Sequence, residues 1–500
     1  MPTNVQSNAH DSNARSPLRA SDVVFMYAAD SEHYRAYGAT FTAWGRAEQA
    51  AEVERHHQLG LRCTGTIWCL TAGEVRLHES AEMREAVARD ITGKPVRVPW
   101  LMDHVYEGTP AWFGCTNHPA FRRLNRELAR RVMAGGADGL HIDDPRGTSG
   151  ALEVSGGGFC DHCMAAFREW LQKHGERDEL VAAGVNDLEA FDYRGLVRRY
   201  ANTREEFLDR RQDIPLYEAF VRFHREAAAE NIRGIIREAE QEAGRQISAS
   251  VNAVAAHESF HEILALDEVT HVVCEVPQYA EAGTKCLCKS EAAYDQAAEL
   301  GKPMAATASG HDWAWVKAHD ATDLPKVWIA LAYACGQRFM VPHPTRQWCM
   351  TEFLGTHWYA AAVEPYIGIY RFIADHAELF DGYESGPPVP QGQTPANTMV
   401  RTRVKDGAPP VVHVVNTDYA AYDPKQKHRN VLRPQQQIEV SLPATLDISE
   451  AGNSCDARDH ATLLRYDADP ITVPVERRGD QYVITLPELN VWTAGVLGDG

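Results

Sequence analysis

From residue 21 to about residue 385, short apolar runs alternate with stretches whose apolar residues recur at helical spacing. We interpret as strands the runs at residues 23–29, 61–68, 111–117, 138–143, 246–252, 269–276, 303–309 and 338–343. Strands that are apolar on both faces and alternate with helices are typical of a parallel sheet covered by helices. Eight such units predict a closed (β/α)8 barrel, or TIM barrel. An open doubly wound sheet is the alternative, but no Gly-x-Gly-x-x-Gly follows the first strand, so dinucleotide binding is not indicated.

This pattern is interrupted once and then ends. A charged helical insertion occupies about residues 176–212, before a long helix from Pro215 that we interpret as the fourth barrel helix. Near residue 386 a Pro/Gly-rich segment leads into alternating apolar and polar residues, which predict a small antiparallel β-sandwich. We therefore expect a disordered tail at residues 1–20, a catalytic barrel at residues 21–385 and a sandwich at residues 386–500.

The overall charge limits the class of partner. The 500 residues include 50 basic and 69 acidic side chains, for a net charge of -19. Because nucleic acids and anionic membranes are bound by basic surfaces, we expect neither and favour a small-molecule carbohydrate. No run reaches the length of a membrane span and residues 1–20 lack the apolar centre of a secretory signal, so we expect a cytoplasmic protein with free thiols. Barrels with appended sandwiches often self-associate, which predicts a homo-oligomer.

Polar and aromatic side chains gather where the predicted strands end. In a (β/α)8 barrel the carboxyl ends of all strands meet at one mouth, and the active site lies there. A sugar offers apolar ring faces to aromatic side chains and hydroxyls to polar ones. The residues that we expect to bind a sugar are Trp68, His118, Asn252, His311, Trp313, His343 and Trp358.

Three carboxyl groups are candidates for catalysis. Cleavage of a glycosidic bond requires a carboxylic acid and a carboxylate on either side of that bond. Asp143 lies two residues after His141 on one predicted strand, so both side chains point to the same side. Glu275 ends another apolar strand, and an apolar environment suits a general acid. Asp144 is either the catalytic aspartate itself or a cap of the following turn, and Asp143 could instead be neutralised by Arg146.

Two cysteine-containing segments resemble those of the family-42 β-galactosidases. They are CTNHPAFRRLNREL at residues 115–128 and GGGFCDHCMAAFREWLQKHG at residues 156–175. In that family four thiols from such segments hold a zinc ion that joins two loops. The resemblance therefore implies a structural metal site rather than a catalytic one.

This chain matches three of the four thiol positions, with Cys115, Cys160 and Cys163, and has Gly158 at the remaining one. The resemblance implies a zinc ion held by these thiols, with His162, a water molecule or a distant cysteine as the fourth ligand. Three buried thiols without metal are the alternative.

The resemblance to family 42 ends at the catalytic residues. That family uses an Asn-Glu pair after the fourth strand and a glutamate after the seventh, whereas this chain has Asp143-Asp144 and the segment MAATASGHDW at residues 304–313. The segment GADGLHIDD at residues 136–144 looks more like putative glycosyl hydrolases, and like barrel α-glycosidases and fucosidases whose nucleophile is an aspartate on the fourth strand. This likeness implies that Asp143 is the nucleophile of a retaining enzyme without a catalytic cofactor.

These features predict a glycoside hydrolase that removes a terminal sugar from a small oligosaccharide or glycoside. Asp143 would attack the anomeric carbon, or activate water if the enzyme inverts, and Glu275 would protonate the leaving oxygen. A second hypothesis is a barrel lyase or isomerase in which His141, Asp143, Glu275 and His343 hold a divalent ion. A third is a sugar-binding barrel without catalysis.

Overall fold

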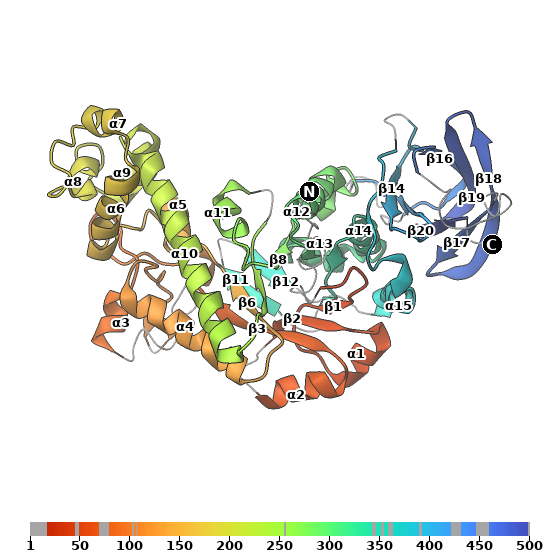
Figure 1. The fold of residues 1–500 in the computed structure, drawn as a ribbon, viewed down its shortest axis with the longest axis horizontal. Coiled ribbons are helices and arrows are strands. Elements are labelled where there is room, and N and C mark those ends of the chain that lie inside the picture. The colour runs from red at the N-terminus through yellow and green to blue at the C-terminus, as the bar shows by residue number, and fades with distance from the viewer. Residues whose placement is uncertain are drawn as a thin grey trace, which may run out of the picture.

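The computed structural model of the chain describes residues 18–45, 50–69, 80–102, 105–106, 108–254, 257–342, 347–351, 355–358, 364–389, 393–421, 432–446 and 460–498. Figure 1 shows three parts in a row. A barrel of strands and helices lies in the middle, a group of helices lies at one end, and an antiparallel sheet lies at the other.

Eight parallel strands form the barrel. In spatial order they are β1 (Val24–Phe25), β2 (Phe41–Gly45), β3 (Arg62–Trp68), β6 (Gly139–Asp143), β7 (Ser248–Val251), β8 (His271–Glu275), β9 (Met304–Thr307) and β10 (Arg338–Phe339). A parallel bridge between Phe25 and Val341 brings the last strand back to the first. The backbone N–H of Val341 also donates to the carbonyl of Val24 at 2.8 Å. The predicted (β/α)8 barrel is confirmed.

One predicted barrel strand was wrong, and one strand of the barrel was missed. Residues 111–117 lie outside the barrel sheet, where Trp112 and Gly114 make isolated bridges. Their apolar neighbours, Ala111 and Phe113, pack in a small separate core instead. The missed strand is β2, which has only five residues and includes a threonine and a glycine, so its apolar pattern is weak.

Helices cover the outside of the barrel. They are α1 (Ser31–Tyr37), α2 (Ala50–Gln58), α3 (Ala81–Glu85), α4 (Pro119–Ala134), α10 (Tyr217–Ala243), α11 (His261–Leu264), α12 (Leu287–Glu299), α13 (Gly310–His319), α14 (Asp323–Ala334) and α15 (Ile367–Asp375). Helix α4 buries Phe121, Leu124 and Val132 along one face and packs beside α10. Helix α10 begins two residues after Pro215 and leads into β7, so it is the fourth barrel helix, as predicted.

The segment between β6 and α10 forms a small helical region of its own. Its helices are α5 (Thr148–Ser155), α6 (Asp161–His174), α7 (Arg177–Ala182), α8 (Tyr193–Val197) and α9 (Arg204–Arg210). Phe159, Phe167 and Tyr193 pack around Phe220 of α10, with ring centroids 5.2, 4.9 and 4.8 Å from it. This aromatic core holds α6–α9 against the N-terminal half of α10 (Figure 1).

An antiparallel sheet follows the barrel. Its strands run in the spatial order β13 (Glu384–Ser385), β14 (Thr398–Val404), β15 (Val411–Asn416), β20 (Trp492–Leu497), β17 (His460–Arg465), β18 (Ala468–Arg478), β19 (Gln481–Leu489) and β16 (Gln435–Pro443). The sheet curls around a core that includes Val412, Val440 and Leu486. This sandwich-like, all-antiparallel part agrees with the predicted fold class.

Trp492, the first residue of β20, joins the sheet to the barrel. It is 2% exposed, and its ring centroid lies 5.4 Å from that of Phe372 on α15 and 5.8 Å from that of Phe380. Apolar residues of β15 and β20 belong to the same buried cluster as the barrel core. The sheet is therefore packed on the barrel through a shared core.

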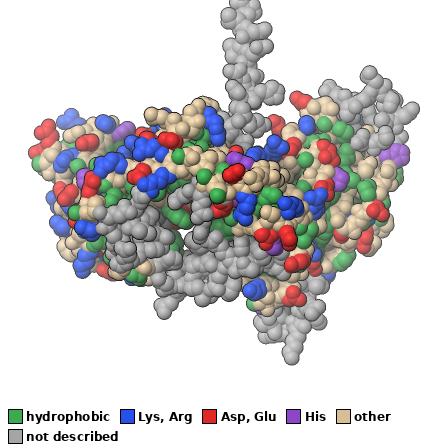
Figure 2. Space-filling model, turned by 90° about the horizontal axis from the view of Figure 1, so that it is seen from below, with side chains coloured by type: hydrophobic (Ala, Val, Ile, Leu, Met, Phe, Trp, Pro, Cys, Tyr) green, Lys and Arg blue, Asp and Glu red, His purple; other side chains and the backbone are tan. Residues whose placement is uncertain are grey.

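Two short hairpins lie outside these sheets. They are formed by β4 (Val105–Tyr106) with β5 (Thr109–Pro110), and by β11 (Gln347–Thr351) with β12 (Gly355–Trp358). Among the described residues, no helix combines the length and the apolar character needed to cross a membrane. On the face shown in Figure 2, acidic and basic side chains are interspersed.

Candidate active site

Asp143 is the last residue of β6 and lies at the mouth of the barrel. It is partly buried, and three N–H groups donate to its carboxylate. The indole of Trp68 donates to Oδ2 at 2.9 Å, and Oδ1 accepts from Asn252 Nδ2 at 2.8 Å and from the backbone of Asp144 at 3.0 Å. Trp68 faces Asp143 because the two residues are paired across β3 and β6. Three N–H donors are the environment that an ionised carboxylate requires.

Asn252 brings the second carboxyl group to the same place. It follows β7, and its Nδ2 lies 2.8 Å from Asp143 Oδ1 and 3.4 Å from Glu275 Oε2, at the end of β8. Because both oxygens are close to one nitrogen, they are no farther apart than the sum of these two distances. The structure therefore brings Asp143 and Glu275 together.

Arg146 was the alternative partner for Asp143. Its guanidinium donates instead to Glu153 at 2.6 Å and to Ser259 Oγ at 3.3 Å, and it lies over the ring of Phe260. These contacts direct Arg146 away from a structural ion pair with Asp143.

Opposing effects set the pKa of Asp143. Burial raises the pKa of its carboxyl group to about 6, and the nearby charge of Glu275 adds to this rise. The hydrogen bonds from Asn252 and Trp68 oppose it by stabilising the charged form. Asp143 is consequently mostly ionised at neutral pH but close to its titration range.

Asp144 has a different environment from Asp143. Burial raises the pKa of Asp144 well above its ordinary value, and repulsion from Asp143 and Glu275 raises it further. Its backbone has a φ of 48°, a left-handed conformation that is uncommon for a residue other than glycine. A carboxyl group that resists ionisation is poorly suited to act as a nucleophile, which favours Asp143 over Asp144 for that role.

Trp68 and Trp313 were both expected to stack on a sugar, and the structure separates them. Trp68 is 37% exposed at the mouth, next to Asp143. Trp313 is fully buried, donates to Thr307 Oγ1 at 3.1 Å and packs against Trp328 at a centroid distance of 5.9 Å. A ring without exposed surface has no face to offer a ligand, so Trp313 is a core residue.

Two of the expected sugar-binding histidines, His118 and His311, lie within the described residues. His118 precedes α4, caps it by accepting from the backbone of Ala120, and packs its ring 4.3 Å from that of His162. It is thus a neighbour of the cysteines, because residues 111–117 are not a barrel strand. His311 is exposed in the first turn of α13. His343 and the side chain of Trp358 lie outside the described residues.

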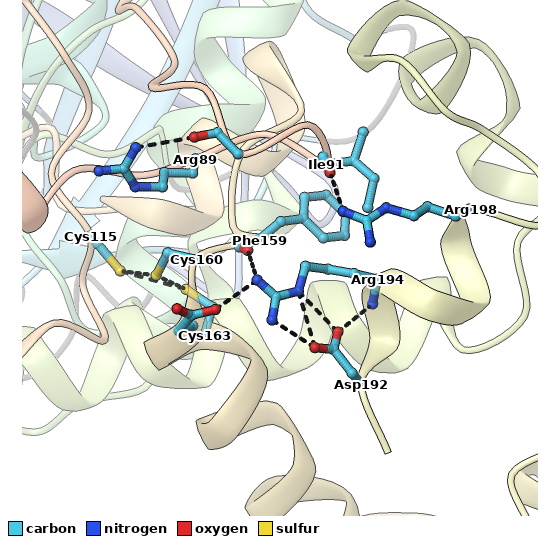
Figure 3. A network of polar contacts seen from close by, with 11 residues as sticks. Arg89, Ile91, Cys115, Phe159, Cys160, Cys163, Asp192, Arg194 and Arg198 are labelled. Carbon is cyan, nitrogen blue, oxygen red and sulfur yellow. Dashed lines mark hydrogen bonds and ion pairs between the residues drawn. The ribbon is translucent and has the colours of Figure 1, made fainter. Parts of the chain in front are cut away.

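The three predicted metal-binding cysteines do come together. The Sγ atoms of Cys115, Cys160 and Cys163 lie 3.3 to 3.5 Å apart, and all three residues are buried (Figure 3). Figure 3 also shows Arg194 beside them, where it pairs with Asp192 at 2.6 Å and contacts the Phe159 carbonyl.

Two residues that hold loops near the site, Asp312 and Thr148, are not among the expected site residues. The carboxylate of Asp312 accepts from the backbone N–H groups of Gln278 and Ala280, each at 2.8 Å, and so fixes the loop that follows Glu275. Thr148 exchanges backbone-to-side-chain hydrogen bonds with Thr116, at 2.7 and 2.8 Å, behind the loop that follows Asp143. Their only sequence signal is their place just after a barrel strand, which many residues share.

Groups of possible metal ligands occur elsewhere than at the carboxyl pair. In the described ranges, sets of three or more His, Cys, Asp or Glu ligand atoms within 4.8 Å of one another are Cys115, Cys160 and Cys163, and His57, Cys63 and Asp138. His141, expected as a ligand in the metal-dependent alternative, is buried inside the barrel and contacts Ser250 Oγ at 2.8 Å.

Comparison with known proteins finds similarity to two α-agarases. The chain is 22% identical to the α-agarase of Alteromonas agarilytica over 303 residues, which are 59% of this chain and 21% of the agarase. It is 25% identical to the α-agarase of Thalassotalea agarivorans over 280 residues, 54% of this chain and 18% of that protein. The chain therefore spans about a fifth of the length of these curated relatives. No protein-family model matches it.

Among solved structures, the chain is similar to a cycloisomaltooligosaccharide glucanotransferase from Paenibacillus sp.. The TM-score is 0.57 at 8% sequence identity, and the match covers 95% of this chain and 84% of the other. At this identity the likeness concerns the fold, and it extends over both the barrel and the antiparallel sheet.

Proposed function

We propose that this chain is a glycoside hydrolase whose catalytic carboxyl pair is Asp143 and Glu275. One observation carries this proposal: a single amide nitrogen, Nδ2 of Asn252, lies within 3.4 Å of both carboxyl groups at the mouth of a (β/α)8 barrel. Two acids that face one another there are what glycosidic cleavage requires. The similarity to α-agarases supports the same reaction class.

In this proposal Asp143 is the nucleophile. Its three N–H donors favour the carboxylate, and they fix the direction of its oxygens without supplying a counter-charge. Asp143 attacks the anomeric carbon as the glycosidic bond breaks, and the glycosyl group becomes esterified to Asp143. Water then attacks the same carbon and releases the carboxylate.

Glu275 is the acid and base of the same cycle. It donates its proton to the glycosidic oxygen while Asp143 attacks, and in the second step it accepts a proton from the incoming water. The amide of Asn252 lies 3.4 Å from Glu275 Oε2 and 2.8 Å from Asp143 Oδ1. Asn252 thus donates more closely to the proposed nucleophile than to the proposed acid.

A retaining mechanism is part of this proposal. Inverting enzymes separate the two carboxyl groups by about 6.5–9.5 Å to admit a water molecule, and retaining enzymes by about 5–5.5 Å. The shared nitrogen keeps one oxygen of Asp143 and one of Glu275 within the sum of 2.8 and 3.4 Å of each other. Retention is proposed on the likeness of residues 136–144 to barrel glycosidases whose nucleophile is an aspartate on the fourth strand.

We infer that the substrate is an agar-type galactan or an oligosaccharide derived from it, because both curated relatives are named α-agarases. The exposed indole of Trp68 would lie under the sugar whose bond is cleaved, since its N–H is held by Asp143. Release of a terminal sugar from a short chain, action in the cytoplasm and self-association are further parts of this proposal.

Isosteric amides test the proposal. Asp143→Asn and Glu275→Gln should each lower kcat on agar-derived oligosaccharides by on the order of 10³-fold or more, because the charge or the proton is lost while the shape is kept. Asp267→Asn and Glu281→Gln, which change exposed carboxyl groups of the same barrel, are the matched controls. Full activity in Asp143→Asn and Glu275→Gln would contradict the proposal.

The metal-dependent lyase or isomerase is the second candidate, and the carboxyl pair does not favour it. Neither Asp143 nor Glu275 belongs to a set of three ligand atoms within 4.8 Å among the described residues. A chelator would abolish such an activity and leave a two-carboxylate hydrolase at work.

A further inference from the structure

The buried thiols of Cys115, Cys160 and Cys163 form a triangle. Cys115 lies in the loop before α4, and the other two lie at the start of α6. Their three Sγ–Sγ distances are 3.3, 3.4 and 3.5 Å, well beyond the roughly 2.05 Å of a disulfide. Figure 3 shows the three sulfur atoms converging on one point from two segments of the chain. Three sulfurs at this spacing form one face of a tetrahedron around a metal ion.

A buried histidine lies next to this triangle. His224, on α10, is 0% exposed, and neither of its ring nitrogens has a hydrogen-bond partner of normal geometry in the described structure. The backbone of Gly158, two residues before Cys160, lies beside this imidazole. A buried imidazole without a good partner is costly, so it calls for an explanation.

Gly158 shows how closely the imidazole approaches the cysteine loop. A Cβ atom at this position would lie 2.7 Å from His224 Nε2, so the ring occupies the space that a side chain of residue 158 would need. Gly158 also has a φ of 100°, which glycine tolerates and other residues rarely adopt. The ring of His224, on α10, therefore packs directly against the loop that carries Gly158 and Cys160.

We propose that Cys115, Cys160, Cys163 and His224 together bind one Zn²⁺ ion. Tetrahedral coordination by three thiolates and one imidazole is a common arrangement of structural zinc. The three sulfurs alone lie within 4.8 Å of one another, so metal binding draws the ring of His224 toward them. This site is separate from the proposed carboxyl pair, and the proposal does not depend on the reaction.

Other side chains near the thiols fit the fourth position less well. His162 is exposed, and its ring packs against His118. Asn117 already donates from Nδ2 to Cys163 Sγ at 3.4 Å, which suits a hydrogen bond to a thiolate that is bound to metal. His224 is the neighbour that combines complete burial with unused nitrogens.

The site would stabilise the loops behind the candidate active site. Cys115 is followed by Thr116, which exchanges two hydrogen bonds with Thr148, five residues after Asp143. Arg194 of α8 donates to the Phe159 carbonyl and to Asp161, on either side of Cys160. A zinc ion would therefore join α4, α6 and α10 where they support the loop after β6.

Metal content and cobalt spectra of the full chain test the proposal. Protein purified under reducing conditions should contain one zinc per chain. Co²⁺ in its place should give thiolate charge-transfer bands with the visible spectrum of a tetrahedral site of three sulfur ligands and one nitrogen ligand. Removing the zinc with a chelator should lower Tm. A folded, reduced wild-type chain that binds neither zinc nor cobalt would overturn the proposal.

Variants of His224 identify the fourth ligand. His224→Ala should weaken zinc binding by more than about tenfold, since even outer-shell changes at metal sites cost this much. His224→Cys should restore tight binding with the spectrum of four thiolates. His162→Ala is the matched control and should leave affinity and spectrum unchanged. An unchanged cobalt spectrum in His224→Ala, or loss of binding in His162→Ala instead, would overturn the assignment of His224.

Discussion

Asp143 and Glu275 end two nearby strands of the barrel sheet, β6 and β8, and each has a carboxyl oxygen within 3.4 Å of the same nitrogen of Asn252. Asn252 follows β7, the strand between them. This arrangement follows from the barrel itself, because the carboxyl ends of its parallel strands all lie at the same end of the barrel.

The pH dependence of kcat/KM should report Asp143. Its pKa is raised to about 6, chiefly by burial, and the proposed nucleophile works only as a carboxylate. Activity should therefore fall about tenfold per pH unit below this value, because the protonated form of Asp143 increases as pH falls. A pH profile of kcat/KM measures this directly. The fall in activity at low pH is called the acid limb of the profile. An acid limb centred near pH 4, or the absence of an acid limb, would show that another group controls the reaction.

Removing the shared donor should move that acid limb. The hydrogen bond from Asn252 stabilises ionised Asp143, so Asn252→Ala should shift the limb above pH 6 and lower kcat. Asn202→Ala, at an exposed position, serves as the control. If Asn252→Ala lowers activity equally at every pH, Asn252 serves binding or stability rather than the ionisation of Asp143.

Two substitutions of Trp68 should separate its N–H from its ring. Trp68→Phe keeps an aromatic face but loses the donor to Asp143, so it should raise the acid limb with little change in KM. Trp68→Ala loses both and should raise KM by about two- to tenfold, in line with the roughly 0.5–1.5 kcal/mol of an aromatic contact. Equal KM values for Trp68→Ala and the wild type would remove Trp68 from the sugar site.

Trp313 should behave as a core residue. Trp313→Ala removes a fully buried ring that packs against Trp328, and it should lower the free energy of unfolding by about 3–5 kcal/mol. The KM of the folded fraction should stay within about twofold of the wild type, because substrate does not reach the ring. Denaturant unfolding and KM measurements provide the test. A stable Trp313→Ala variant with a greatly raised KM would reverse this assignment.

The sequence predicted the barrel because its strands are buried on both faces and so appear as short apolar runs. The prediction failed at two places where the apolarity of a short segment does not show whether that segment belongs to the barrel. Phe113 is as apolar as a strand residue but packs in a small core beside the barrel, whereas Gly45 of β2 lacks a side chain altogether. At Gly45 an added Cβ would lie 2.4 Å from the Thr64 carbonyl, so close strand approach, rather than apolarity, selects the residue there.

The carboxyl pair was predictable because Asp143 and Glu275 each end an apolar run. Their shared donor was not, since Asn252 was expected to bind sugar hydroxyls and a sequence does not show which neighbour an amide faces. Nor does a sequence show whether the ring of a tryptophan is exposed or buried. Trp68 ends a strand and points to the mouth, whereas Trp313 lies in a helix whose orientation decides whether it is buried.

The most direct test of the central claim is chemical rescue by azide, with the anomeric configuration of the product determined by NMR. The experiment uses an aryl glycoside or oligosaccharide that the wild type cleaves. In Asp143→Gly azide should replace the nucleophile and give a glycosyl azide of configuration opposite to the substrate. In Glu275→Ala it should attack the enzyme-bound ester and give the same configuration as the substrate. The reverse assignment, or wild-type hydrolysis in both variants, would contradict the account.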